Sequence, residues 1–386
     1  DDQWLVFCLY TERGGTVDNL WHIFTDFYGG QYAPLAFLSY LVLYAGFGYD
    51  PFYFHMFSLL LHIGCVCLVW KLISSLLRVH GGVSEKQILY VNFITTLLFA
   101  VHPINVEAVA WISALKVLLY AFFYLLGLLC YLRYIRTSKI FYYVLTIGCF
   151  LCSFWGKEQA VTYPLALLIV DWFTNRNMIN LEEWSEKMSY LIMAFFFGII
   201  TVLSQGKGPY EMIFPLYQRL LFGCFALVEY ITKSLLPVNL NFFYPFPIVL
   251  GEEPPLHYYL YPVVLLFLMG WIIAYRNNRY LVFGVLLFLV NLLFSIHLFN
   301  MSRHAIVADR YMYLSYVGIA FLIANGIWWL RKRLSYFKAA LVFLFFYCFF
   351  LSVYTFHYTK KWENTTMVKK YTKEVLEKRL NGSNHL

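Results

Sequence analysis

Long apolar runs are the feature of this sequence that most limits its fold. A helix needs about 20 apolar residues to cross a membrane, and inside the bilayer every backbone group must be hydrogen-bonded, which favours helices. The strongest candidate spans are 51–77, 114–135, 189–205, 258–275, 280–299, 312–331 and 337–357, with shorter ones at 88–101, 140–156 and 159–174. The sequence predicts an all-α fold, a polytopic transmembrane helix bundle of about 10–11 membrane segments plus interfacial helices.

Composition supports this class and excludes a nucleic-acid-binding protein. Only 13% of the residues are charged and 61% are hydrophobic, whereas a soluble globular domain has about 25% charged residues. The formal net charge of +8 comes largely from short basic loops between apolar runs, such as 131–139, 275–280 and 330–338. Such loops are typical of the cytoplasmic side of a membrane protein.

Two further apolar segments carry features that do not suit a membrane span. The segment 33–50 is interrupted near its end by two glycines and an aspartate, and 217–236 contains Glu229 and Lys233. We expect both segments to lie in the membrane interface. If 217–236 does not span, all the basic loops fall on the same side of the membrane.

This topology places many polar residues together on the non-cytoplasmic face. They are Asp1, Asp2, Asp18, His22, Asp26, His102, Glu107, Lys157, Glu158, Lys207, Arg219, Arg303, His304, Asp309 and Arg310. Ionisable groups at a membrane edge are costly unless they are paired, so they commonly mark a functional site. Simpler explanations exist for single members: Lys157 and Glu158 can form an interfacial ion pair, and His102 before Pro103 can end a helix.

Acids and cations on one face are suited to group transfer from a phosphate. Lysine and arginine bind phosphate oxygens through charge-assisted hydrogen bonds, and a carboxylate can deprotonate a hydroxyl acceptor. A membrane-embedded enzyme of this kind would use a lipid-phosphate donor. Lys116, about one or two helical turns from the same edge, can add to the positive charge.

Several blocks of the sequence resemble a known family over about residues 1–330. They are "DD" (1–2), the segment 29–62, "LFAVHPINVEAVAWIS" (98–113), "FWGKEQAVTYPLALLIVDW" (154–172) and "ADRYMYLS" (308–315). These blocks resemble the membrane domain of the transmembrane and tetratricopeptide-repeat O-mannosyltransferases and of their bacterial relatives. That family belongs to the C superfamily of glycosyltransferases, which use polyprenyl-phosphate sugars.

The resemblance implies a role for individual residues. It implies catalytic roles for Asp1, Asp2 and Glu107, with one aspartate as the base. It implies donor-phosphate binding by Lys157, Arg303 and Arg310. It implies supporting roles for His102, Glu158 and Asp309. A divalent metal such as Mg²⁺ or Mn²⁺ is possible, although the sequence does not require one.

The sequence also departs from the family pattern. Many relatives carry S-G-R-K-D after the A-W motif, whereas this chain reads "ISALKV" (112–117) and lacks the arginine and the aspartate. Three regions are expected: 1–50, a first external loop with interfacial helices whose preceding spanning helix is missing; 51–357, the transmembrane bundle; and 358–386, a polar tail in which the repeat domain is absent or truncated.

The resulting functional prediction is an integral-membrane glycosyltransferase on the non-cytoplasmic face. It moves a sugar, mannose as the first choice, from a polyprenyl-phosphate carrier to a hydroxyl of a protein, glycan or lipid, by inverting displacement. The expected partners are this donor, the acceptor and membrane lipids, with no nucleic acid, and the bacterial inner membrane is favoured over the endoplasmic reticulum. The alternatives are a non-catalytic membrane scaffold and a transporter of a lipid-linked precursor.

Overall fold

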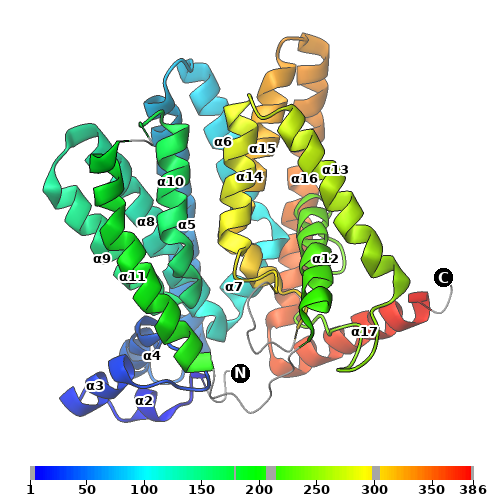
Figure 1. Ribbon diagram of the computed structural model, residues 1–386. Coiled ribbons are helices and arrows are strands. Elements are labelled where there is room, and N and C mark those ends of the chain that lie inside the picture. Colours follow the sequence, from blue (N-terminus) through cyan, green and yellow to red (C-terminus); the bar gives the residue numbers. More distant parts are fainter. Residues whose placement is uncertain (1–4, 178–179, 206–213, 298–304, 384–386) are drawn as a thin grey trace.

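The protein is a helix bundle, as the sequence predicts. A computed structural model describes residues 5–177, 180–205, 214–297 and 305–383, and in this part of the chain all regular elements are helical. Figure 1 shows the long helices running roughly side by side, with smaller helices across the lower end of the bundle. The predicted all-α, polytopic architecture is therefore confirmed.

Six described helical segments are long and apolar enough to cross a membrane. Each contains one long helix: α5 (Pro51–His80), α8 (Leu115–Thr137), α11 (Leu181–Gln205), α13 (Leu260–Ala274), α15 (Met312–Leu330) and α16 (Leu334–Thr359). A seventh span is formed if α6 (Glu85–Val101) is counted together with the short helices after it, which lie at an angle of 51°. These helices account for most of the strong candidates in the sequence.

Shorter helices complete the bundle. They are α9 (Ile140–Gly156), α10 (Tyr163–Phe173) and α14 (Arg279–Leu292). Helix α9 packs on α8, and α14 packs on both α10 and α15. Helix α14 ends at Leu292, so the helix is shorter than the apolar run 280–299 that predicted it. The predicted total of about 10–11 membrane segments is reached only if these shorter helices are counted as spans.

The two segments expected at the interface also form helices. Helix α4 (Pro34–Phe47) ends before Gly48, whose φ of +64° lies in the region that glycine adopts without strain. Asp50 then caps the next helix by accepting a hydrogen bond from the backbone N–H of Phe52, 3.0 Å away. Helix α12 (Leu216–Leu235) is not among the six long apolar spans, in agreement with its three charged residues, Arg219, Glu229 and Lys233.

The lower end of the bundle in Figure 1 carries the elements that build the candidate site. Helices α2 (Leu9–Glu12), α3 (Val17–Thr25) and α4 form a small apolar core of their own with the adjacent ends of α5 and α8. Helix α17 (Thr365–Ser383) lies across the same end.

Short helices connect the longer ones. They are η1 (Pro103–Asn105), α7 (Val106–Ala110), η2 (Ile112–Ala114), η3 (Glu158–Thr162), η4 (Leu256–Tyr259), η5 (Asp309–Tyr311) and η6 (Lys360–Trp362).

Helices α14 and α15 approach each other closely because two glycines face each other. A Cβ atom added to Gly318 would lie 2.5 Å from the carbonyl oxygen of Gly284 and 2.7 Å from the backbone nitrogen of Phe288. Backbone atoms cannot move away as a side chain can. This contact fixes α15, whose first residues come directly after the candidate site.

Replacement of Gly318 by alanine should therefore destabilise the bundle. We expect Gly318→Ala to cost about 1–3 kcal/mol through overpacking, measured as a lower midpoint of thermal unfolding in detergent. Gly270→Ala on α13 is the matched control, because no atom lies within 4 Å of its added Cβ. Equal melting temperatures for the two variants would contradict the close α14–α15 contact.

Candidate functional site

The site begins where α6 ends at His102. A residue before proline disfavours helical geometry, and His102 adopts an extended conformation. Its Nδ1 accepts a hydrogen bond from the backbone N–H of Ile104 at 3.2 Å, and its ring lies 4.2 Å from that of Tyr316. Asn105 donates to the carbonyl oxygen of Phe99 at 2.7 Å. These contacts redirect the chain into η1 and α7, so His102 acts as a structural cap here.

Helix α7 carries Glu107 into an ion pair with Arg310, in which the carboxylate is fully buried. Glu107 is 0% exposed, and its Oε1 contacts the guanidinium of Arg310. Its Oε2 accepts a hydrogen bond from the backbone N–H of Arg310 at 2.7 Å. The Arg310 side chain remains 20% exposed and lies over the ring of Trp111, 5.2 Å from its centroid. Arg310 can thus bind an anion from the partly open side while Glu107 holds it.

Asp309, one residue earlier on η5, has separate partners. Both of its oxygens accept hydrogen bonds from the hydroxyl of Tyr244 at 3.0 Å, and Lys233 Nζ lies 3.4 Å from Oδ1. The ammonium of Lys233 also donates to the Tyr244 hydroxyl. Asp309, Lys233 and Tyr244 are all buried. We call these three residues the Asp309 triad.

Two more lysines extend the positive charge of the site. Lys116, near the start of α8, is partly exposed and donates a hydrogen bond to the neutral side-chain oxygen of Gln31. It interacts electrostatically with Lys157, Arg310 and Glu158. Charges from α8, η5 and the α9–η3 junction therefore meet at one place.

Lys157 takes a buried position in this group. It is 2% exposed, and its Nζ lies 4.5 Å from the ring centroid of Tyr311. A lysine over an aromatic ring is held by the negative face of the π system. Arg310 lies beside the same ring, at 5.1 Å. Tyr311 thus keeps two cations near each other that would otherwise repel.

The structure brings most of the predicted site residues together. Glu107, Lys157, Glu158, Asp309 and Arg310 lie at the same end of the bundle, whereas His102 serves the backbone turn. Asp1, Asp2 and Arg303 lie outside the described residues. Their predicted roles, like the catalytic assignments of the other residues, stay predictions.

Sequence reasoning gave no role to Lys233 and Tyr244. The signal for Lys233 was present, because a lysine in an apolar helix must find a partner. Its carboxylate partner lies 76 residues away in the chain, which no local pattern reveals. Tyr244 belongs to a loop rich in aromatic residues, where nothing marks it among its neighbours.

The described residues contain no group of three or more His, Cys, Asp or Glu side chains placed to hold a metal ion. Two carboxylates that could serve as hard oxygen ligands, Glu107 and Asp309, are engaged by Arg310 and Lys233. The possible Mg²⁺ or Mn²⁺ therefore gains no support from the described residues.

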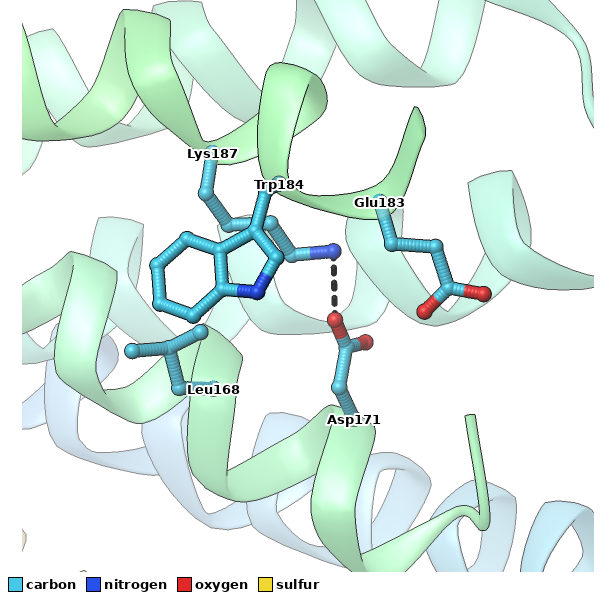
Figure 2. A pocket seen from close by; sticks show the side chains of 5 residues that line it. All are labelled: Leu168, Asp171, Glu183, Trp184 and Lys187. Carbon is cyan, nitrogen blue, oxygen red and sulfur yellow. Dashed lines mark ion pairs between the residues drawn. The ribbon is translucent and has the colours of Figure 1, made fainter. Parts of the chain in front are cut away.

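A second buried charge cluster lies at the opposite end of the bundle, where α10 meets α11. The carboxylate of Asp171 pairs with Lys187 and accepts hydrogen bonds from Tyr131 at 2.8 and 2.9 Å. Figure 2 shows this pair beside Trp184 and Glu183, around a small pocket. The cluster joins α8, α10 and α11.

Breaking the Glu107–Arg310 pair on one side should destabilise the protein. Loss of one partner leaves a buried charge without compensation, at a cost of about 3–5 kcal/mol. We expect Glu107→Gln and Arg310→Gln each to lower the unfolding midpoint in detergent, and the double variant to recover much of the loss. Arg78→Gln, which removes an exposed ion pair with Glu85, should cost about 0–1 kcal/mol. Strictly additive effects of the two single changes would contradict the coupling.

Comparison with known proteins identifies relatives over part of the chain. Protein O-mannosyl-transferase TMTC2 of Mus musculus is 34% identical over 169 residues, which are 39% of this chain and 19% of that protein. Protein O-mannosyl-transferase Tmtc3 of Drosophila melanogaster is 29% identical over 162 residues, 37% of this chain and 17% of that protein. TMTC4 of Homo sapiens is 31% identical over 165 residues, 37% of this chain and 22% of that protein.

The matched region is thus about a fifth of the length of these relatives. No family model matches the chain, and no solved structure matches it. The relatives carry the same enzyme name in mammals and in an insect. Over the matched region, the chain is a relative of the TMTC protein O-mannosyl-transferases.

Proposed function

We propose that this chain forms the membrane part of a glycosyltransferase that moves mannose from a polyprenyl-phosphate carrier to a hydroxyl group of a protein. The relatives are named protein O-mannosyl-transferases, which supports mannosyl transfer and a protein acceptor. The donor carrier, the mechanism and the membrane face go beyond those names and rest on the site itself.

The observation that carries the proposal is the convergence of three cations at one end of a membrane bundle. Lys116, Lys157 and Arg310 come from different elements, and Lys116 interacts electrostatically with the other two. Two carboxylates lie among them, Glu107 paired with Arg310 and Glu158 near Lys116, so positive charge is in excess and the arrangement suits an anionic ligand. A phosphate attached to a lipid would reach such a site from the membrane.

The reaction would be a displacement at the anomeric carbon. The acceptor oxygen forms a bond to this carbon while the bond from the carbon to the phosphate oxygen breaks, and the polyprenyl phosphate leaves with the bonding electrons. The acceptor proton moves to a carboxylate. Cations aimed at the leaving phosphate stabilise the charge that develops there. Attack opposite the leaving group inverts the configuration.

Burial and exposure support the following division of these roles among the residues. Arg310 and Lys116 are partly exposed and would contact the donor phosphate, while Lys157 would add positive potential from its buried position. Glu107 would position Arg310, because it is buried against it. The base would be Asp1 or Asp2, as the family resemblance implies. Glu158 is a further, partly exposed carboxylate near Lys116.

One observation favours the alternative of a non-catalytic membrane scaffold. Glu107, a predicted catalytic carboxylate, is buried and neutralised by Arg310. Together with the missing arginine and aspartate after Trp111, this would suit a relative that has lost catalysis. The transporter alternative is less well supported, because the charges lie at one end of the bundle and not at its centre.

The protein is a multi-pass membrane protein, and we propose that the site faces the non-cytoplasmic side. The basic loops that join α5 to α6, α8 to α9 and α15 to α16 lie at the upper end in Figure 1, opposite the site. Basic loops favour the cytoplasmic side. The mouse, fruit-fly and human relatives are animal proteins, so a bacterial inner membrane stays a prediction without support from them.

The experiment is a transfer assay with full-length protein and radiolabelled polyprenyl-phosphate mannose, in Mg²⁺, in Mn²⁺ and with a chelator. We expect transfer or donor hydrolysis, and a fall of at least about 100-fold in Asp2→Asn because the base is lost. Lys116→Gln and Arg310→Gln should weaken donor binding. Because Arg310→Gln also lowers stability, its donor binding is measured at a temperature at which the variant is folded.

Arg78 provides the control, since Arg78→Gln removes an exposed positive charge in the last turn of α5, at the end of the bundle opposite the site. It should leave donor binding and transfer unchanged. Folded protein that binds no polyprenyl-phosphate sugar would contradict the proposed function and favour the scaffold. Donor binding without transfer in any acceptor mixture would favour the transporter.

A further inference from the structure

We propose that Lys233 is a positioning residue for donor binding: through Asp309 it fixes the one-turn helix η5, and thereby the guanidinium of Arg310. This inference rests on the proposed function, because it concerns how the same site holds the donor phosphate. Lys233 is 3% exposed. It would therefore act through its neighbours and not by touching the donor.

The three residues of η5 each contact a different part of the protein. Asp309 is held by Lys233 on α12 and by Tyr244 in the loop after that helix. Arg310 is held by Glu107 on α7 through both its backbone and its side chain. Tyr311 lies under Lys157, which comes directly after α9. The position of η5 thus decides where two of the site's cations lie.

The contact between Asp309 and Lys233 is sensitive to the loss of charge on the lysine. Asp309 is 0% exposed, and a carboxylate removed from water is strongly destabilised unless a cation and hydrogen-bond donors compensate it. Tyr244 supplies the hydrogen bonds, and Lys233 supplies the charge. Without Lys233, Asp309 would have to take up a proton or move towards water, and η5 would move with it.

A neighbouring carboxylate and backbone contacts complete this anchor. Glu229 lies 3.8 Å from Lys233, one helical turn earlier on α12. The loop that carries Tyr244 pairs with the strand-like segment before η5, since the backbone N–H of Ile306 donates to the carbonyl oxygen of Tyr244 at 2.9 Å. Helix α12 and its loop therefore both contact the region of η5, which gives this helix a role in the site.

The test compares Lys233→Met with Lys187→Met. Lys187 is buried to the same extent, pairs with a buried aspartate and lies by a tyrosine, but at the opposite end of the bundle. Both changes should lower the unfolding temperature. We expect only Lys233→Met to weaken the binding of polyprenyl-phosphate mannose, by about tenfold, because a small displacement of a positioned group is enough for such a loss.

A second, milder variant tests the inference in case Lys233→Met does not fold. Tyr244→Phe keeps the charge pair and removes the hydroxyl that donates to Asp309 and accepts from Lys233 and from the backbone N–H of Asn241. We expect about a threefold weaker donor affinity. In kinetic assays the KM for the donor should rise in both variants, with a smaller change in kcat, since the carboxylate base is untouched. The exposed-site variant Arg78→Gln, at the opposite end of the bundle, should show no change in donor affinity.

The outcomes separate the inference from the proposed function. Wild-type protein that binds no donor would overturn both. Donor affinity that is unchanged in folded Lys233→Met and Tyr244→Phe, or reduced equally in Lys187→Met, would overturn the inference alone. In either of these cases the Asp309 triad would be only a structural element.

Discussion

The buried ion pair between Glu107 and Arg310 is the interaction on which the rest of the site depends. A carboxylate with no exposed surface at the end of a membrane bundle is tolerated only if a cation and hydrogen-bond donors compensate it. Arg310 provides both, through its guanidinium and its backbone N–H. This double contact requires α7 and η5 to meet in one orientation. The break after α6 makes that orientation possible, because a continuous helix would carry Glu107 past η5.

Local patterns in the sequence were sufficient for the helices and for the breaks between them. The apolar runs predicted the long helices, and His102 before Pro103 predicted the end of α6. The pairing of charges could not be read in the same way. Glu107 and Arg310 are 203 residues apart in the sequence, and a charged residue at a helix end looks the same whether its partner is water, a ligand or another side chain. The sequence could therefore place these residues on one face but could not show which of them neutralise each other.

This pairing changes the chemistry that the residues can perform. As an exposed carboxylate, Glu107 could accept a proton; as the buried partner of Arg310, it fixes the direction of a guanidinium. A positioned guanidinium recognises phosphate through two parallel hydrogen bonds, which a mobile lysine does not reproduce. Lys116 complements it as a compact charge with a neutral neighbour, Gln31. The site thus combines one positioned and one adaptable cation, and the proposed reaction calls for both, because the donor phosphate would be held first and released after transfer.

At both ends of the bundle, a buried aspartate is compensated by the same residue types. At each end a lysine, a tyrosine and an aspartate are buried together, as Lys233, Tyr244 and Asp309 at one end and as Lys187, Tyr131 and Asp171 at the other. The difference lies in the surroundings of each aspartate. A partly exposed arginine lies beside each aspartate. Arg176, next to Asp171, is paired with three carboxylates, those of Asp171, Glu183 and Glu186, so its cluster holds the helices together. Arg310, next to Asp309, is paired with Glu107, and in the proposed role it keeps part of its guanidinium for a ligand. Position in the fold, and not residue type, separates a structural charge cluster from one that serves a binding site.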